Sequence, residues 1–349
     1  MRSLVCLLAI PVLMMTSGCS TAPKEAPVVV DSVAVQPPSI KGYEAMKVPA
    51  DNPMTQAKID LGKTLYYDKR LSGDGSRACY SCHLKESGLT DGKPTAIGAY
   101  EAKLPRASPT LWNIGFHQAL YWDGRSPSLE KQGMAAWTGG NMGVSGKDGR
   151  PSSADIAAKL NAIPGYTTAF QKAFGGPATP ENIIQAISTF ERTIVAADSN
   201  WVKFRSGEEA AFNDGAKRGW LIFKDKAKCV NCHDGLLLTD QEYHNVGIGM
   251  DAPKPDMGRF VVSKVEKDTG AFKTPTLLDI SKSAPYFHNG SVATLEEAVD
   301  LMLNGGKKNK HLDTTNLKPV KLSKAEKDDL LAFLKALDVE YAVSEPTLP

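Results

Sequence analysis

The residues with the clearest chemical signature form a five-residue pattern that occurs twice, at Cys79–His83 and at Cys229–His233. In each copy two cysteines are separated by two residues, and a histidine follows directly. This spacing is typical of covalent c-type haem attachment, in which both thiols form thioether bonds to the porphyrin and the histidine becomes an iron ligand. The sequence therefore predicts two covalent haems, attached at Cys79, Cys82, His83, Cys229, Cys232 and His233.

A zinc site is the main alternative for such cysteine pairs. Structural zinc needs further Cys or His ligands at short spacing, whereas these two pairs lie in different halves of the chain. The repeated histidine directly after each pair favours haem. Because haem attachment uses four of the six cysteines, and Cys6 and Cys19 lie near the N-terminus, we expect no structural disulfide.

The first residues read as an export signal. Arg2 precedes an apolar run from Leu4 to Met15, so residues 1–18 are predicted to be a signal peptide and the protein to be periplasmic. The run ends in Thr16-Ser17-Gly18-Cys19, which is similar to a lipoprotein cleavage box and would make Cys19 a lipid anchor to the membrane. Ordinary signal cleavage remains the alternative, because Thr16 stands where that box has an aliphatic residue. Residues 19–47, rich in Pro, Val, Ala and Ser, predict an extended tether.

Composition describes an ordinary globular protein. The chain has 349 residues, is 42% hydrophobic and 23% charged, and its net charge of +2 gives no sign of nucleic-acid binding. Its length and its two haem motifs predict two domains, residues 48–198 and residues 199–349, each with one haem.

Helical patterns precede both haem motifs. Residues 57–67 carry apolar side chains at helical spacing, as do residues 212–223, and the two stretches are similar enough to suggest a duplicated cytochrome c unit. Capping signals open further helices after Thr179 and Ser323, and a shorter helix is expected over residues 153–163. The predicted fold is mostly α, with two cytochrome c-like domains and long loops. Residues 84–149 are expected to form a long functional loop around the first haem.

Four ordered motifs carry a family resemblance. Besides the paired haem motifs, these are residues 105–111 (PRASPTL), residues 122–130 (WDGRSPSLE), residues 272–277 (FKTPTL) and residues 284–291 (APYFHNGS). Together they resemble the bacterial dihaem cytochrome c peroxidase and MauG superfamily. The resemblance covers nearly everything from residue 48 to residue 337.

The resemblance implies a division of labour between the haems. The first would be the peroxide site, the second would receive electrons, and Trp122 would bridge them. A buried aromatic residue in a domain interface is the plainer interpretation of Trp122. The resemblance also places Met302 opposite His233 as the second axial ligand, where a thioether gives a high-potential iron. Met302 equally fits a core position of a helix. MauG-type members have tyrosine there, so methionine favours electron relay.

The first haem site departs from the family pattern. Where typical peroxidases have a distal histidine, this chain has Ala99, which leaves His83 as the expected single protein ligand. His117 is the nearest substitute in sequence, with a structural role as its alternative. Gln132 matches the family's peroxide-orienting glutamine, but Asn141 replaces its glutamate. Asparagine can position peroxide and cannot transfer a proton; Glu130 or a water is a conceivable substitute.

The resemblance also implies a calcium ion between the domains. Ala107 stands where that site has an asparagine, so only backbone carbonyls near Ser283 and Pro285 remain to hold an ion.

Three functions follow from these residues. The first is a peroxidase that reduces hydrogen peroxide to water with electrons from a small cytochrome c or a cupredoxin, through the Met302-ligated haem and Trp122. The second is a MauG-like oxidase that modifies Trp or Tyr of a partner protein. Trp137 and Trp201 are candidate surface relays for it, although single tryptophans more often serve in packing. Against it stand Met302 and Ala227, the latter replacing an exit tryptophan. The third is a dihaem electron carrier or peroxide sensor.

Overall fold

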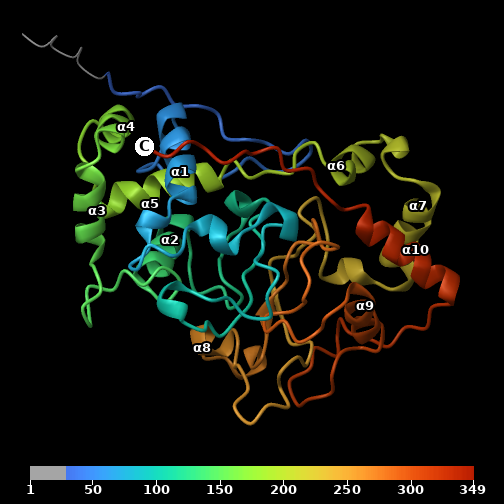
Figure 1. The fold of residues 1–349 in the computed structure, drawn as a ribbon. Helices are drawn as coiled ribbons and strands as arrows, with labels where there is room; N and C mark the ends of the chain where they lie inside the picture. Colours follow the sequence, from blue (N-terminus) through green and yellow to red (C-terminus); the bar gives the residue numbers. More distant parts are fainter. Residues whose placement is uncertain (1–28) are drawn as a thin grey trace, which may run out of the picture.

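The computed structural model describes residues 29–349, which form a mostly helical body with long loops (Figure 1). This confirms the predicted fold class. The ten α-helices of these residues are α1 (Gln56–Tyr67), α2 (Leu129–Thr138), α3 (Ser153–Asn161), α4 (Pro164–Phe174), α5 (Pro180–Glu191), α6 (Asn200–Arg205), α7 (Asp214–Leu221), α8 (Phe260–Ser263), α9 (Leu295–Leu303) and α10 (Lys324–Lys335). Two short strands, β1 (Tyr243–His244) and β2 (Phe272–Lys273), pair antiparallel.

The N-terminal segment packs against the helices instead of hanging free. The predicted signal peptide and Cys19 lie outside the described residues. Of the predicted tether, residues 29–47 are extended, but the backbone N–H of Asp31 donates to the carbonyl of Lys172 in α4, 2.8 Å away. Ile40 and Met46 are buried. No helix among residues 29–349 is both long enough and apolar enough to cross a membrane.

Two close helix pairs organise the body. Helix α1 crosses α5, and α7 crosses α10. A Cβ atom on Gly62 would lie 2.6 Å from the carbonyl carbon of Ala186, and one on Gly219 would lie 2.7 Å from that of Asp329. Only glycine permits backbones to approach this closely. The two halves therefore repeat the same glycine-dependent crossing, as the similarity of their sequences predicts.

Most of the predicted helices are present at their predicted places. Helix α5 follows Thr179 and α10 follows Ser323, and both serine and threonine hydroxyls accept the expected capping hydrogen bonds. The expected helix over residues 153–163 ends at Asn161. The predicted loop over residues 84–149 contains a helix that the prediction missed, α2. It buries only Leu129 and Trp137, so its sequence has almost no apolar period.

The hydrophobic core is continuous between the two halves. Helices α1, α3, α4 and α5 enclose one cluster, and a second cluster joins Trp112 and Phe190 of the first half to Phe223 and Phe333 of the second. The indole N–H of Trp112 donates to the buried Asp279 carboxylate, 2.6 Å away. The C-terminal segment runs from α10 back towards α1 and α4 (Figure 1).

Candidate functional site: two cavities joined at one tryptophan

The first haem motif lines the larger of two cavities. After α1 the chain turns through a short 3₁₀ segment, Cys79–Cys82, and both cysteines and His83 border a cavity of about 700 Å³. The Nδ1–H of His83 donates to the carbonyl of Leu89, 3.0 Å away. This hydrogen bond fixes the tautomer, so the unprotonated Nε2 is the atom left to bind iron.

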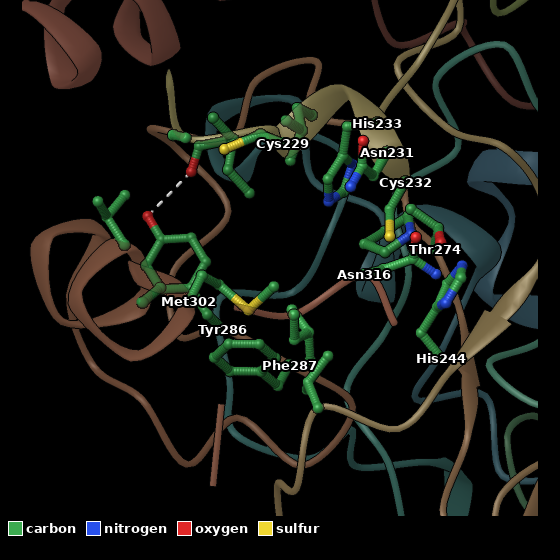
Figure 2. A pocket seen from close by; sticks show the side chains of 18 of the residues that line it. Cys229, Asn231, Cys232, His233, His244, Thr274, Tyr286, Phe287, Met302 and Asn316 are labelled. Atoms are coloured by element: carbon green, nitrogen blue, oxygen red, sulfur yellow. Dashed lines mark hydrogen bonds between the residues drawn. The ribbon is translucent and has the colours of Figure 1, made fainter. Parts of the chain in front are cut away.

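The second haem motif repeats this local geometry. Cys229, Cys232 and His233 line a cavity of about 220 Å³ (Figure 2). His233 again donates from Nδ1 to a backbone carbonyl, that of Leu238, at 3.0 Å. Burial lowers the pKa of both His83 and His233, so each ring is in the neutral form that ligates a metal.

These residues fit c-type haem and fit zinc poorly. All four motif cysteines are free and half-buried, and each pair borders the same cavity as its histidine. Burial raises the pKa of the Cys79 thiol, and raises that of Cys229 to about 12, which disfavours the thiolate that zinc requires. Both cavities are large and mostly apolar in their lining, as a porphyrin needs.

Met302 faces the second cavity from the side opposite the haem motif. It lies near the end of α9, and Figure 2 shows its thioether and the His233 ring pointing into the same space. Its helix neighbours Leu295, Ala298 and Val299 also line this cavity. The arrangement suits the predicted axial ligand, which stays a prediction.

Trp122 stands between the two cavities. Its side chain borders the first cavity, the second cavity and a smaller one of about 120 Å³ that lies between the halves. Its indole N–H donates to the carbonyl of Ala107, 3.0 Å away. The edge of the ring also meets His288, with ring centroids 6.5 Å apart. The indole is therefore fixed in place and is not merely filling a loose interface.

Gln132 and Asn141 both reach the first cavity. Gln132 comes from α2, and Asn141 comes from the turn after it. Ala99 is buried and does not line the cavity; its backbone N–H donates to the carbonyl of Asn141 at 3.0 Å. Among the described residues that line this cavity, His83 is the one histidine.

His117 and Glu130, which the sequence offers as substitutes at the first haem site, lie outside the lining of the first cavity. His117 borders only the small middle cavity, where its Nδ1 accepts from the Lys273 ammonium, 2.8 Å away. Glu130 forms an ion pair of 2.8 Å with Arg192 and does not border the first cavity. Neither residue borders the first cavity.

Sequence reasoning missed a carboxyl group that does border the first cavity. Glu191, at the end of α5, is only 7% exposed, and burial raises its pKa to about 8. Ile184 and Ile187 line the same cavity, so the three residues share one face of α5. Their helical spacing is the signal that places Glu191 beside the haem motif.

The expected surface relays are not at the surface. Trp137 is 3% exposed and Trp201 is 1% exposed. The indole N–H of Trp137 donates to the carbonyl of Leu71 inside the first half, and Trp201 packs among aromatic rings. The surface-relay hypothesis is therefore wrong, and the alternative of a packing role holds for both residues.

The middle cavity offers little to a calcium ion. Ala107, Ser283 and Pro285 border it, as the sequence suggested, but Lys273 borders it too. Lys273 is 7% exposed, and burial lowers its pKa to about 8. Its ammonium would repel a divalent cation in the same small space.

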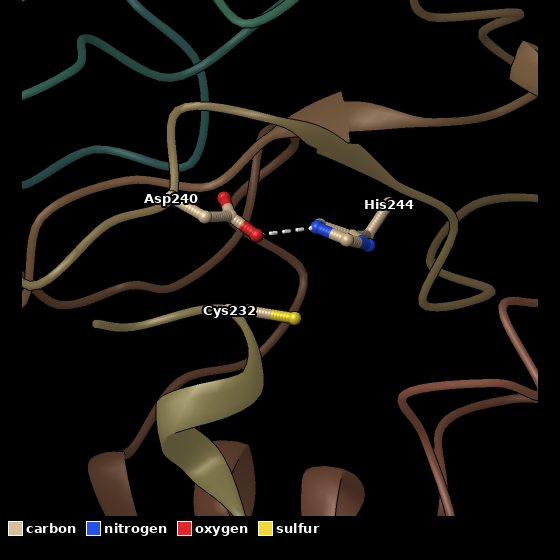
Figure 3. Close-up of side chains that lie close together, drawn as sticks. All are labelled: Cys232, Asp240 and His244. Carbon is tan, nitrogen blue, oxygen red and sulfur yellow. Dashed lines mark hydrogen bonds and ion pairs between the residues drawn. The ribbon is translucent and has the colours of Figure 1, made fainter.

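A second polar cluster, beside the second haem motif, resembles a metal site without being one. Cys232, Asp240 and His244 lie close together (Figure 3). The Nε2 of His244 is 2.9 Å from Asp240, and its Nδ1 is 2.6 Å from Asp313. Although burial opposes the charge, Asp240, the Cys232 sulfur and Asp313 together raise the pKa of His244 to about 11. Both ring nitrogens of the imidazolium are occupied, and Cys232 is needed for haem, so no ligand set for a metal remains.

Comparison with known proteins agrees with this geometry. The family model of di-haem cytochrome c peroxidases matches residues 56–210. The chain is similar to the methylamine utilization protein MauG of Methylorubrum extorquens, with 35% identity over 95% of this chain and 92% of that protein. It is also similar to the cytochrome c551 peroxidase of Pseudomonas aeruginosa, with 33% identity over 85% of this chain and 83% of that protein.

Solved structures show the same likeness. A MauG-like protein associated with microbial copper homeostasis superposes with a TM-score of 0.78 and 35% identity, covering 86% of this chain and 94% of that one. The Y463M variant of the diheme peroxidase BthA from Burkholderia thailandensis superposes with a TM-score of 0.69 at 18% identity, over 89% of this chain and 92% of that one. The second likeness concerns the fold alone.

Proposed function

Because the chain belongs to the di-haem cytochrome c peroxidase family, we propose that it reduces hydrogen peroxide to water with electrons from a small cytochrome c or a cupredoxin. The overall reaction consumes one peroxide, two protons and two electrons and forms two waters. The observation that carries the proposal is the asymmetry of the cavities. The first has His83 as the one histidine among the described residues that line it, whereas the second has Met302 on the side opposite His233.

We propose that each CxxCH motif holds its haem by two thioether bonds. Cys79, Cys82 and His83 would hold the first haem, and Cys229, Cys232, His233 and Met302 the second. Bound haem iron supplies the redox chemistry that cleaves the O–O bond. Covalent attachment and the export signal of residues 1–18 support a periplasmic location, with Cys19 as a candidate lipid anchor.

The residues around the first cavity would orient peroxide and supply a proton. Gln132 and Asn141 can each donate and accept hydrogen bonds there. Asn141 carries no transferable proton at neutral pH, but Glu191 borders the same cavity, and its pKa of about 8 keeps its carboxyl largely protonated at pH 7. Glu191 is therefore the candidate proton donor of this chain, in place of the family glutamate.

Trp122 would carry electrons between the sites. It borders both cavities, and an indole held by its hydrogen bond to Ala107 needs little rearrangement when its charge changes. Electrons that enter at the second haem would thus reach the first cavity through one residue.

Turnover with purified holoprotein tests the proposal. Hydrogen peroxide is added with an excess of a reduced small cytochrome c or cupredoxin, and donor oxidation and peroxide loss are followed together. The proposal predicts two donors oxidised for each peroxide consumed. Peroxide consumption with no donor oxidation would contradict it.

A second candidate function is favoured by the 35% identity with MauG, namely oxidation of Trp or Tyr side chains of a partner protein. The single histidine of the first cavity suits both functions. Burial of Trp137 and Trp201 removes two possible relays to the surface, and Met302 favours electron entry. Peroxide-dependent change in the mass of a co-purified protein, with negligible donor oxidation, would favour this second function.

A further inference from the structure

Exposed lysines stand at the opening of the second cavity. Most of the residues that line this cavity are buried or half-buried, but Lys228, Asn231 and Lys318 are exposed and line it as well. The cavity therefore reaches the surface beside these three residues. Lys228 directly precedes the first cysteine of the second haem motif, so a haem bound here has its edge close to this part of the surface.

Positive charge is concentrated around this opening. Residues 305–327 contain seven lysines and two carboxylates, a net charge of +5 (7 − 2), whereas the whole chain carries +2. The remainder of the chain therefore carries −3. Both carboxylates are engaged, since Asp313 binds His244 and Glu326 binds Lys226. Three of the seven lysines are engaged as well, because Lys310 pairs with Glu266, Lys324 with Asp328 and Lys327 with Asp300. Lys307, Lys308, Lys318 and Lys321 form no ion pair with a described carboxylate, and Lys318 lines the second cavity.

We define the lysine rim as Lys228, Lys318 and Lys321. All three are exposed, and none forms an ion pair with a described carboxylate. The exposed carboxylates nearest in sequence to Lys228 are Asp225 and Asp234, and Asp225 lies 3.9 Å from Lys224. The exposed carboxylate nearest in sequence to Lys318 and Lys321 is Asp328, which pairs with Lys324. The lysine rim therefore presents unneutralised positive charge.

The backbone at Lys228 gives a second, independent observation. Lys228 has a φ of 58°, in the left-handed region that glycine and asparagine adopt more readily. A lysine at this position has a conformational cost, and its side chain makes no hydrogen bond or ion pair within the described residues that would offset it. Eleven other non-glycine residues of the described chain share a positive φ, so the feature of Lys228 that bears on binding is its ammonium group, which has no partner among the described residues.

We propose that the lysine rim is the docking surface for an acidic small redox protein that delivers electrons to the second haem. This inference rests on the proposed function and names the charge of the donor. Opposite charges on two surfaces steer association and raise the association rate by about 10- to 1000-fold at low salt. Docking here would bring a donor's redox centre close to the second cavity, where its exposed lining residues Lys228, Asn231 and Lys318 lie.

Stopped-flow reduction of the second haem tests the inference. The oxidised holoprotein is mixed, without peroxide, with a reduced acidic cupredoxin or with a reduced basic cytochrome c, at ionic strengths from about 10 mM to 0.5 M. The acidic donor is expected to react faster at low salt, and its rate constant should fall steeply as salt screens the charges. Equal rates for both donors, or a faster basic donor, would overturn the proposal.

Charge reversal provides the matched variants. The double variant K228E/K318E should slow the acidic donor about tenfold or more at low salt and should leave the basic donor at least as fast. K159E reverses an exposed lysine of α3 in the first half and should change the rate less than twofold. Neutral K228Q/K318Q should give an intermediate rate, and unchanged haem spectra show that the variants are folded. Equal effects of K159E and K228E/K318E on the reduction rate would contradict the proposal that the lysine rim is the docking surface.

A neutral small-molecule reductant separates the inference from the proposed function. Suppose that peroxide turnover with this reductant fails, while the acidic donor still reduces the second haem faster than the basic donor. The peroxidase proposal then fails and the docking surface stands. If turnover succeeds and the acidic and basic donors react at equal rates, the docking-surface proposal fails and the peroxidase proposal stands. Binding of the holoprotein to anionic lipid vesicles through the same lysines, with no preference between donors, would also overturn it.

Discussion

Replacing Gly219 by alanine tests whether the glycine-dependent helix crossing builds the second haem site. A Cβ at this position would lie 2.7 Å from both the carbonyl carbon of Asp329 and the Cβ of Phe333. Carbon atoms prefer separations of about 3.5 Å or more, which these two contacts miss by about 0.8 Å. The carbonyl oxygen of Asp329 would lie closer still, so α7 and α10 must separate by at least this amount. The nearest obstacle is backbone, which cannot rotate away.

The cost follows from two opposing effects. Overpacking of this kind costs about 1–3 kcal/mol, and the rigid obstacle places Gly219→Ala near the upper end. Alanine gains about 1 kcal/mol in helix propensity. The net expected loss of unfolding free energy is therefore about 2 kcal/mol. Phe223, Leu330 and Leu334 line the second cavity, so the displacement should also loosen the second haem.

Gly215 of the same helix is the matched control. A Cβ there would meet its nearest atoms at 3.4–3.6 Å, an ordinary contact distance. Gly215→Ala should thus stabilise the protein by up to about 1 kcal/mol, which makes a difference of about 3 kcal/mol between the two variants. Urea unfolding of the holoproteins, followed by circular dichroism, measures both. Equal stabilities of the two variants would refute the reasoning.

Three further predictions concern the two cavities. Met302→Leu keeps the side-chain volume and removes the sulfur. It should convert the second haem from low to high spin in EPR and lower its reduction potential by at least about 100 mV. An unchanged EPR spectrum would exclude Met302 as a ligand. Trp122→Phe should slow electron transfer between the haems about tenfold or more in flash or stopped-flow kinetics while both haem spectra stay unchanged; an unaffected rate would remove Trp122 from the path. The pKa of Glu191 is about 8 in the folded protein and about 4.5 in the unfolded chain. Between these two pH values the folded state binds more protons than the unfolded state. The free energy of unfolding should therefore fall as the pH rises from about 4.5 to 8. Glu191→Gln should make this fall shallower in urea titrations, and an identical pH profile would show that Glu191 does not titrate in this way.

Local signals predict much of this fold. Helices α5 and α10 follow capping residues that are readable in the sequence, and α1 has a clear apolar face. Helix α4 was missed although Pro164 opens it and Gly175 ends it in the left-handed conformation. Those two residues are a readable helix signal, so this element was within reach of sequence reasoning.

Some residues of the candidate site can likewise be predicted from the sequence, and others cannot. The haem motifs follow from spacing alone, and family resemblance places Trp122, Gln132 and Asn141, all of which reach a cavity. The pairing of Lys273 with His117 joins residues 156 positions apart. No local pattern encodes such a contact, because it depends on how the loops of the two halves meet.

Because Ala99 stands where a distal histidine is expected and His83 is the one histidine among the described residues that line the first cavity, we propose that the first haem is open to an oxidant without prior reduction of the second. Stopped-flow addition of hydrogen peroxide to the fully oxidised and to the half-reduced holoprotein, with both haem spectra followed, tests it directly. The account predicts that the first haem reacts in both samples at similar rates. Reaction only in the half-reduced sample, with a six-coordinate first haem in the EPR spectrum of the oxidised protein, would contradict it.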